Sequence, residues 1–476
     1  MAQPEDTTTN HVSGGVFLST LVQGRDLRVR LPAQIPPALS ALPAAAPAFT
    51  GRTAELTALL DVLAPAREDR ETTPSTPTLA VVSGLAGIGK TALALQAAHT
   101  ALQRGWFPAG VLYTDLRGHD HGPPLSSADA LEGQLRALGV PGDRIPPGTT
   151  DRARLLSAVL AAFQQHHRTL LVVLDDPRSH DQVLPLLPTG AGTRTIITSR
   201  LPLPHLPCAP PPRRLTMGAL DPEDCARLLH RALTLARPGD TRTKDRPHDT
   251  NRLAQLCGGH PLALRTAAAQ LAENPARTLS ALADDLTDPG TRLEELSRPA
   301  PGIRAGFDRS YERLAPDQAR LYRLLPLIPT LLVPTAAASA LLGADHRTTQ
   351  RLLHALAHVL EPHGEQCWGM HSLVRLHADE HGRRAAGTDG RHAAYSRLLS
   401  HYLATAQAAG ARMSAATDSP PHHAPTRRRA RDWSDADEAA LTAAALAAAA
   451  DPAHAEIGER LHRALQRRRS GRGPQH

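Results

Sequence analysis

A glycine-rich run that ends in lysine and threonine is the part of this sequence best suited to chemistry. It matches the pattern G-x-x-x-x-G-K-[ST] and consists of Gly84, Leu85, Ala86, Gly87, Ile88, Gly89, Lys90 and Thr91. Glycines let backbone N–H groups surround phosphate oxygens, the lysine ammonium neutralises the terminal phosphates, and the threonine hydroxyl binds Mg²⁺. Lys90 is one of only two lysines among 53 lysine and arginine residues, so composition does not explain it. The run predicts a site for ATP or ADP with Mg²⁺.

Two acidic residues at the end of an apolar run are candidates for the metal and for hydrolysis. Residues 170–174 are apolar, and Asp175 and Asp176 follow them. We expect Asp175 to reach Mg²⁺, directly or through water, and Asp176 to polarise an attacking water if hydrolysis occurs. Many strands end in an aspartate, so this signal depends on its pairing with the glycine-rich run.

An arginine ends a third run and is a candidate sensor of the terminal phosphate. Residues 196–199 are Ile, Ile, Thr and Ser, and Arg200 follows them. The carboxyl ends of parallel strands border the ligand crevice, so Arg200 there would contact the γ-phosphate and report its presence. A solvated arginine at a strand end explains the same residue equally well, and the sequence leaves both interpretations open.

The segments that must position these residues alternate between strand and helix patterns. Apolar runs predict strands, and amphipathic segments between them predict helices. This alternation predicts an α/β P-loop NTPase fold with a doubly wound parallel sheet. The predicted strands cover residues 79–82, 110–115, 170–174, 194–198 and 214–217, and the predicted helices cover residues 53–63, 91–104, 126–138 and 151–166.

After residue 217 the strand patterns nearly stop, and the chain is predicted to be mostly helical. The polar stretch 237–250 is predicted to be a mobile loop, and residues 366–370 are the one strand-like piece in a helical group at 301–383. In the first 48 residues, a small hairpin over 16–31 and a disordered leader are equally consistent with the sequence. Helices are predicted at 222–235, 251–256, 261–271, 279–286 and 395–409, and in an alanine-rich segment that Ser434 opens.

Length and composition indicate the number of domains and the cellular location of the protein. A chain of 476 residues is long enough for about three domains of ~150 residues each. From the polar, acidic first ten residues we expect no signal peptide, and three prolines interrupt the most apolar stretch, residues 324–343. The four cysteines form no CxxC pair, as expected of reduced thiols. We therefore expect a cytoplasmic protein without a membrane span.

The charge and the histidine content raise the questions of nucleic-acid binding and of metal binding. The formal net charge of +7 would suit nucleic acid or an acidic partner. However, the arginine clusters at 427–429 and 467–469 lack interleaved aromatic residues, so a solvated basic tail is the default interpretation. The 25 histidines show no HExxH or CxxC…HxxxH spacing, and we expect scattered surface histidines instead of a metal site.

Several short motifs, taken in order, resemble the NB-ARC group of STAND signalling NTPases. The resemblance spans about residues 49–383, and residues 115–119 and 10–26 resemble the actinobacterial branch in particular. The motifs are Phe49-Thr50-Gly51-Arg52, the run 84–91, Leu174-Asp175-Asp176, Thr198-Ser199-Arg200, Gly258-Gly259-His260-Pro261-Leu262 and Met370-His371-Ser372. The resemblance implies a division of the chain into a leader and Pro/Ala linker (1–48), a P-loop nucleotide-binding domain (49–217), a small helical domain (218–300), a winged-helix-like domain (301–385) and a degenerate, basic, partly disordered helical tail (386–476).

What the resemblance implies about function is a switch. Pro261 would line the adenine pocket, and His371 would touch the β-phosphate and hold an ADP-bound closed state. ATP, sensed by Arg200, would open the domains and promote self-assembly or binding of protein partners. Ser372 stands where the family has aspartate, which predicts weaker autoinhibition, and His260 stands where leucine is typical. The family's C-terminal repeat array is not recognised, so a truncated or decaying regulator is one interpretation.

Two other functions remain open on the sequence. A metabolic P-loop ATPase or phosphotransferase would need acceptor-binding residues, and no such constellation is visible. A DNA-binding transcriptional regulator would use the winged helix or the basic tail, but the expected reading helix, residues 351–358, is mostly apolar. The sequence favours the switch, with at most slow ATP hydrolysis.

Overall fold

The computed structural model describes most of the chain as two compact units. It covers residues 42–65, 78–119, 122–188, 193–201, 203, 206, 211–298, 302–364, 366–417 and 435–471. The hairpin expected at 16–31 and the helix-opening Ser434 lie outside these ranges. The first unit comprises Met1–Gln255 and Gly259–Leu282, and the second comprises Leu256–Gly258 and Ala283–His476. The finer domain division predicted from the sequence stays a prediction.

A five-stranded parallel sheet forms the centre of the first unit. Its strand order is β2-β3-β4-β1-β5, and every pairing between neighbours is parallel. The strands are β1 (Thr78–Gly84), β2 (Val111–Asp115), β3 (Leu171–Asp175), β4 (Arg194–Ser199) and β5 (Arg213–Met217). All five carboxyl ends therefore meet at one edge, which confirms the predicted α/β P-loop fold.

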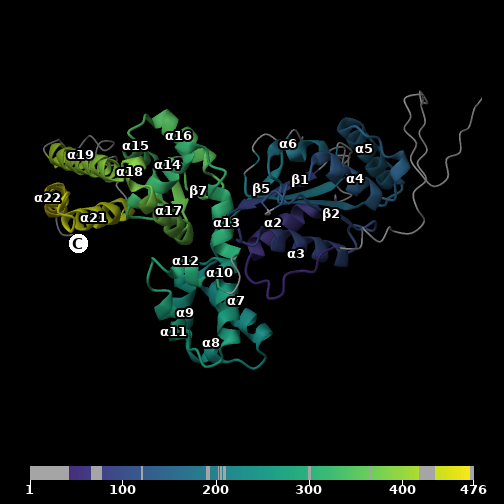
Figure 1. The fold of residues 1–476 in the computed structure, drawn as a ribbon, viewed down its shortest axis with the longest axis horizontal. Helices are drawn as coiled ribbons and strands as arrows, with labels where there is room; N and C mark the ends of the chain where they lie inside the picture. Colours follow the sequence, from purple (N-terminus) through teal and green to yellow (C-terminus); the bar gives the residue numbers. More distant parts are fainter. Residues whose placement is uncertain are drawn as a thin grey trace, which may run out of the picture. The chain divides into compact units, whose positions relative to one another are not determined.

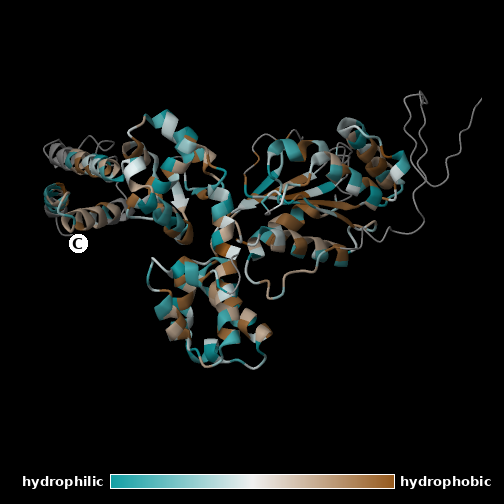
Figure 2. Cartoon of the chain, in the orientation of Figure 1, coloured by the Kyte–Doolittle hydropathy of each residue, from teal (hydrophilic) through white to brown (hydrophobic). Residues whose placement is uncertain are grey.

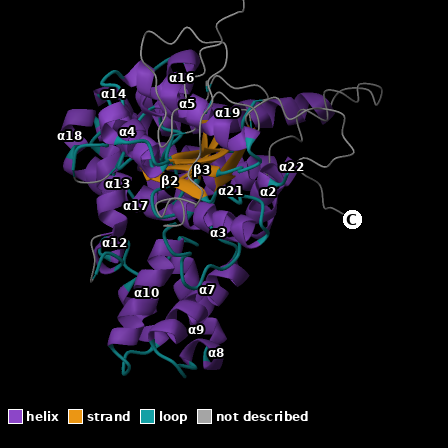
Figure 3. Cartoon of the chain, turned by 90° about the vertical axis from the view of Figure 1, so that its right-hand side faces the viewer, coloured by secondary structure: helices purple, strands orange, loops and turns teal. Residues whose placement is uncertain are grey.

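Helices cover both faces of this sheet. The strands β1, β3 and β4 are buried almost throughout, whereas β5 exposes both of its arginines. The sheet, whose central part is largely brown in Figure 2, lies between α3 on one side and α4 with α5 on the other (Figures 1 and 3). Ser126 caps α4 as predicted, because its hydroxyl accepts a hydrogen bond from the Asp129 N–H at 3.1 Å. The helices are α2 (Thr53–Leu63), α3 (Lys90–Gln103), α4 (Ser127–Ala137), α5 (Thr149–Gln165) and α6 (His180–Val183), with 3₁₀ turns at Gly142–Arg144 and Leu184–Leu186.

The first unit continues into a group of helices in which α7 packs against α10. The prediction of a mobile loop at 237–250 is wrong, because two helices form there. The Arg242 guanidinium binds the Asp240 carboxylate and also the carbonyls of Leu271 (2.7 Å) and Arg277 (2.6 Å), so its polar groups are used inside the fold. The helices are α7 (Pro222–Ala236), α8 (Arg242–Asp245), α9 (Pro247–Leu256), α10 (Pro261–Glu273) and α11 (Leu279–Asp285).

The second unit is helical around a small antiparallel sheet of order β6-β8-β7. The sequence predicted only the central strand, because the outer two are three residues long and contain Pro334 and Pro362. The strands are β6 (Leu332–Pro334), β7 (Leu360–Pro362) and β8 (Cys367–Met370). The helices are α12 (Arg292–Glu295), α13 (Gly302–Tyr311), α14 (Pro316–Leu324), α15 (Thr335–Leu342), α16 (His346–Ala355), α17 (Ser372–Arg384), α18 (Ala386–Asp389), α19 (Arg391–Thr417), α21 (Asp435–Ala449) and α22 (Ala455–Gly471), with a 3₁₀ turn at Leu325–Leu327. Within the described ranges, no helix is both long and apolar enough to cross a membrane.

Candidate phosphate-binding site

The glycine-rich run forms a tight loop between β1 and α3. Gly84, Gly87 and Gly89 have φ values of +146°, +73° and +101°, which favour glycine. A Cβ atom at Gly84 would lie 2.7 Å from the Met217 carbonyl oxygen, and one at Gly87 would lie 2.8 Å from His260 Cε1. Both conformation and space therefore require glycine here. Such a loop before a helix N-terminus turns backbone N–H groups towards an anion.

Lys90 is the first residue of α3, and its side chain folds back over the loop. Its ammonium donates hydrogen bonds to the carbonyls of Gly84 (3.0 Å) and Leu85 (2.8 Å), and the residue is only 8% exposed. Burial and, to a smaller extent, the charge of Arg200 lower the pKa of Lys90 to about 7, against the opposing charges of Asp176 and Asp175. Lys90 is thus a buried cation whose charge depends on nearby anions.

Thr91 and Asp175, the two residues predicted to hold Mg²⁺, are in contact. The Thr91 hydroxyl donates to the two Asp175 carboxylate oxygens at 2.8 and 3.1 Å. Tyr113 donates to the same carboxylate at 2.8 Å, and Thr198 donates to it as well. These hydroxyl and carboxylate oxygens are the donor type that Mg²⁺ prefers, so the residues fit that ion.

Asp176 and Arg200 lie together at the same edge of the sheet. Arg200 Nε is 3.7 Å from Asp176 Oδ1, and His119 Nδ1 is 2.8 Å from that oxygen. The backbone N–H of His119 donates a hydrogen bond to the other Asp176 carboxylate oxygen at 3.0 Å. Burial alone would raise the pKa of Asp176, but the His119 hydrogen bond and the charges of His119, Arg200 and Lys90 outweigh it and lower the pKa. The carboxylate predicted to polarise water is therefore held by His119.

His260 and Pro261 bring the helical part of the first unit against the loop. His260 is fully buried, and its Nε2 lies 2.9 Å from the Ala86 carbonyl oxygen. Pro261 begins α10 and lines a mostly apolar pocket together with Ile88 and Leu228. The residue expected at the adenine is therefore beside the loop.

His371 belongs to the second unit, where it caps α17. Its Nδ1 accepts a hydrogen bond from the Leu373 N–H at 3.2 Å. Burial lowers the pKa of His371 to about 4, against a hydrogen bond with the Gly258 backbone. The imidazole is thus held neutral at neutral pH. Its contact with a nucleotide stays a prediction.

Four residues around this site were not identified as functional from the sequence. Thr198 stands in the predicted strand end beside Arg200, and His119 stands in the family-like segment 115–119, so both carried a weak signal. His260 was noted only as a departure from the family motif, because its role depends on a long-range contact. Tyr113 carried no signal, because its role depends on sheet register. The expectation of surface histidines is wrong for several of them, since the structure buries His119, His260, His377 and His454.

The strand order, the glycine-rich loop after β1 and the Thr91–Asp175 contact together define an α/β P-loop fold. Among known proteins, the chain is similar to the regulatory protein AfsR of Streptomyces coelicolor, with 36% identity over 372 residues, 77% of this chain and 36% of that protein. It is 34% identical to AfsR of Streptomyces griseus over 426 residues, 86% of this chain and 41% of that protein. The chain thus spans about two fifths of the length of these relatives.

Likeness to solved structures is weaker. The ORC2 protein of Aeropyrum pernix has a TM-score of 0.39 and 14% identity, covering 74% of this chain and 98% of that one. A STAND protein with a tetratricopeptide repeat sensor from Pyrococcus horikoshii has a TM-score of 0.29 and 16% identity, covering 92% and 60%. No protein-family model matches the chain.

Proposed function

We propose that this chain is a regulatory switch of the NB-ARC/STAND type that binds ADP in one state and ATP in another. One observation carries the proposal: a glycine loop, a buried lysine and a hydroxyl–carboxylate pair lie together at one edge of the parallel sheet. The similarity to proteins named as regulatory, over 77% of the chain, favours a regulatory role over a metabolic one.

The chemistry of the loop suits a di- or triphosphate. Its N–H groups and the positive end of α3 would face the phosphate oxygens. Lys90, which now donates to two carbonyls, would gain an anionic partner of full charge. Thr91 and Asp175 would hold Mg²⁺, which neutralises charge on the β- and γ-phosphates when bound. Pro261 and its apolar neighbours would take the adenine.

Arg200 is the proposed sensor of the γ-phosphate. It now lies beside the Asp176 carboxylate, and a γ-phosphate would compete with that carboxylate for the guanidinium. A ligand shifts an equilibrium only through different affinity for the two states, and this competition supplies such a difference between ATP and ADP. Because His119 also holds Asp176, we propose that any hydrolysis is slow.

The second unit supports the remaining part of the proposal. The order α14, β6, α15, α16, β7, β8 is the helix–strand–helix–helix–strand–strand order of a winged helix. We propose that residues 301–385 form that domain and that residues 218–300 form the small helical domain. His371 would then lock the ADP state, as the family resemblance implies. We also propose a cytoplasmic location, with which the buried, reduced Cys225 agrees.

Mass spectrometry and light scattering test the proposal. We expect ADP to be released from freshly purified, denatured protein, and ATP with Mg²⁺ to increase the molar mass measured in solution. Arg200→Ala should keep ADP but lose the ATP response, whereas Arg213→Ala, an exposed arginine on β5, should behave as the parent. An ATP response retained in Arg200→Ala would contradict the sensor role. Fast acceptor-dependent ATP turnover would favour a phosphotransferase, and salt-sensitive, sequence-selective DNA binding would favour a DNA-binding regulator.

A further inference from the structure

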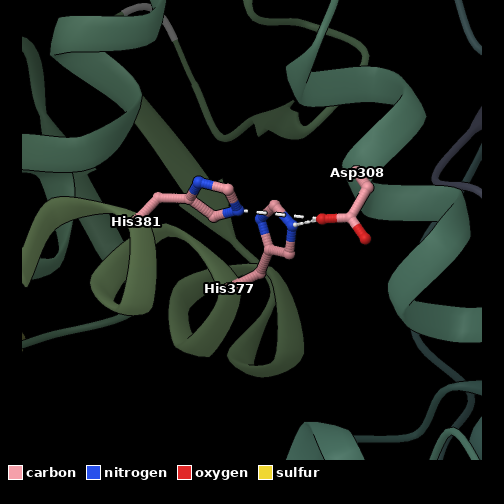
Figure 4. A group of neighbouring side chains, drawn as sticks. All are labelled: Asp308, His377 and His381. Carbon is pink, nitrogen blue, oxygen red and sulfur yellow. Dashed lines mark hydrogen bonds and ion pairs between the residues drawn. The ribbon is translucent and has the colours of Figure 1, made fainter. Parts of the chain in front are cut away.

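Two histidines and an aspartate in the second unit form a cluster away from the phosphate loop. His377 and His381 lie one turn apart on α17, and Asp308 faces them from α13 (Figure 4). His377 Nε2 is 2.8 Å from Asp308 Oδ1, and His381 Nε2 is 3.7 Å from the same oxygen. One potential ligand atom of each residue lies within 4.8 Å of the others.

This spacing fits a small divalent metal ion. Zn²⁺ binds histidine nitrogen and carboxylate oxygen at about 2.0–2.2 Å in a tetrahedron, which places neighbouring ligand atoms roughly 3.3 Å apart. The two measured separations lie on either side of that value. The nitrogens of the two histidines lie within 4.8 Å of each other, so rotation of the partly exposed His381 side chain would bring the three atoms to bonding distance of one ion.

The surroundings of His377 orient it as metal ligands are oriented. Its side chain is fully buried, and its Nδ1 lies 2.9 Å from the Tyr322 hydroxyl, so Nε2 is the nitrogen that faces Asp308. Ligand histidines are commonly held through their second nitrogen in this way. His381 and Asp308 are 21% and 37% exposed on their side chains, which leaves one side open to solvent. An ion has an entry path there, and a water can be its fourth ligand.

A simple His–Asp ion pair explains only part of the cluster. Such a pair accounts for His377 with Asp308, but it does not require a second imidazole whose ring centre lies 4.5 Å from the first. Two imidazolium rings at that distance repel each other, whereas two neutral rings can share a metal ion. The nearby Arg304 is paired with Glu380 at 2.8 Å, so its charge is balanced locally.

We propose that Asp308, His377 and His381 bind one divalent transition metal ion, with Zn²⁺ the best fit among common metals. Three protein ligands and a water complete a tetrahedral site, and the ion links α13 to α17. Because α17 begins at the cap formed by His371, the metal holds the helix that carries this residue. None of the three ligands belongs to the proposed nucleotide site.

The full chain, made without a polyhistidine tag because a tag would itself bind Zn²⁺, tests this site. After Zn²⁺ loading and dialysis, elemental analysis should find about one equivalent in the parent and in Lys90→Ala. His381→Ala and Asp308→Asn should retain none, and His346→Ala, an exposed histidine of the same unit, should retain one. Circular dichroism confirms that each variant is folded.

Spectroscopy and thermal melting provide the second readout. Co²⁺ should give the intense visible bands of tetrahedral coordination in the parent, and these bands should be lost in His381→Ala. Zn²⁺ should raise the melting temperature of the parent by several degrees but leave that of Asp308→Asn unchanged. Absence of retained metal in the folded parent, or equal retention in the parent and both ligand variants, would overturn the proposal.

Discussion

The sharpest prediction concerns the pH dependence of nucleotide binding, which Lys90 should control. Burial and the charge of Arg200 hold its pKa near 7 in this structure. A phosphate beside the ammonium favours the protonated form and raises the pKa, so binding is linked to proton uptake. Proton uptake on binding means that a rise in pH weakens nucleotide affinity. Affinity is greatest below pH 7, where Lys90 is already protonated, and falls as pH rises through that value.

The magnitude follows from the fraction of Lys90 that carries a proton. With a pKa of about 7, roughly 10% of the free protein is protonated at pH 8 and roughly 1% at pH 9. The dissociation constant for ADP should therefore rise by close to tenfold over that unit, equivalent to about 1.4 kcal/mol. The phosphate itself is fully ionised in this range because its second pKa is near 6, so it adds no slope.

Calorimetry in buffers of different ionisation enthalpy measures this proton uptake. At pH 8 the parent should take up nearly one proton per ADP bound. Lys90→Arg should bind more weakly and show little pH slope between pH 8 and 9, because a guanidinium stays charged. Lys244→Ala, which removes the only other lysine and an exposed one, should match the parent. A parent affinity that is flat from pH 8 to 9 would refute this reasoning.

Three further predictions follow from single contacts. Gly87→Ala, at φ +73° and with His260 in the way of a Cβ atom, should weaken ADP binding at least tenfold in titrations, and parent-like affinity would contradict the loop geometry. Thr91→Ala removes a donor to Asp175 and should abolish most of the Mg²⁺ dependence of ATP affinity; an unchanged Mg²⁺ dependence would remove Thr91 from the metal site. Asp389→Ala leaves Arg323 without the carboxylate that it binds at 2.6 Å, and urea denaturation should show a loss of roughly 3 kcal/mol in the free energy of unfolding, whereas a loss below 1 kcal/mol would show that the pair contributes little.

Local patterns were enough to predict the first unit's sheet and loop. The bounds predicted for α2 match the structure, and the capping of α4 by Ser126 followed from a four-residue pattern. Thr91 and Asp175 were predicted to reach the same Mg²⁺, and the structure places their side chains in contact, because β1 and β3 have their carboxyl ends at one edge of a parallel sheet. These features depend on short-range periodicity and on a rule of topology.

Features that depend on contacts distant in sequence were missed. Arg242 stabilises α8 through carbonyls about 30 residues away, which no local pattern reveals. The strands β6 and β7 are too short to show alternation. The cluster at Asp308 was missed, because its two histidines, four residues apart, match no known metal-binding spacing and the carboxylate comes from another helix.

Calorimetric titration of nucleotide-free, folded protein with ADP and with ATP plus Mg²⁺ is the decisive test of nucleotide binding at the glycine-rich loop. We expect one saturable site for each nucleotide, with binding greatly weakened in Lys90→Ala and unchanged in Lys244→Ala. An absence of heat with both nucleotides, or equal binding by Lys90→Ala and the parent, would contradict this expectation.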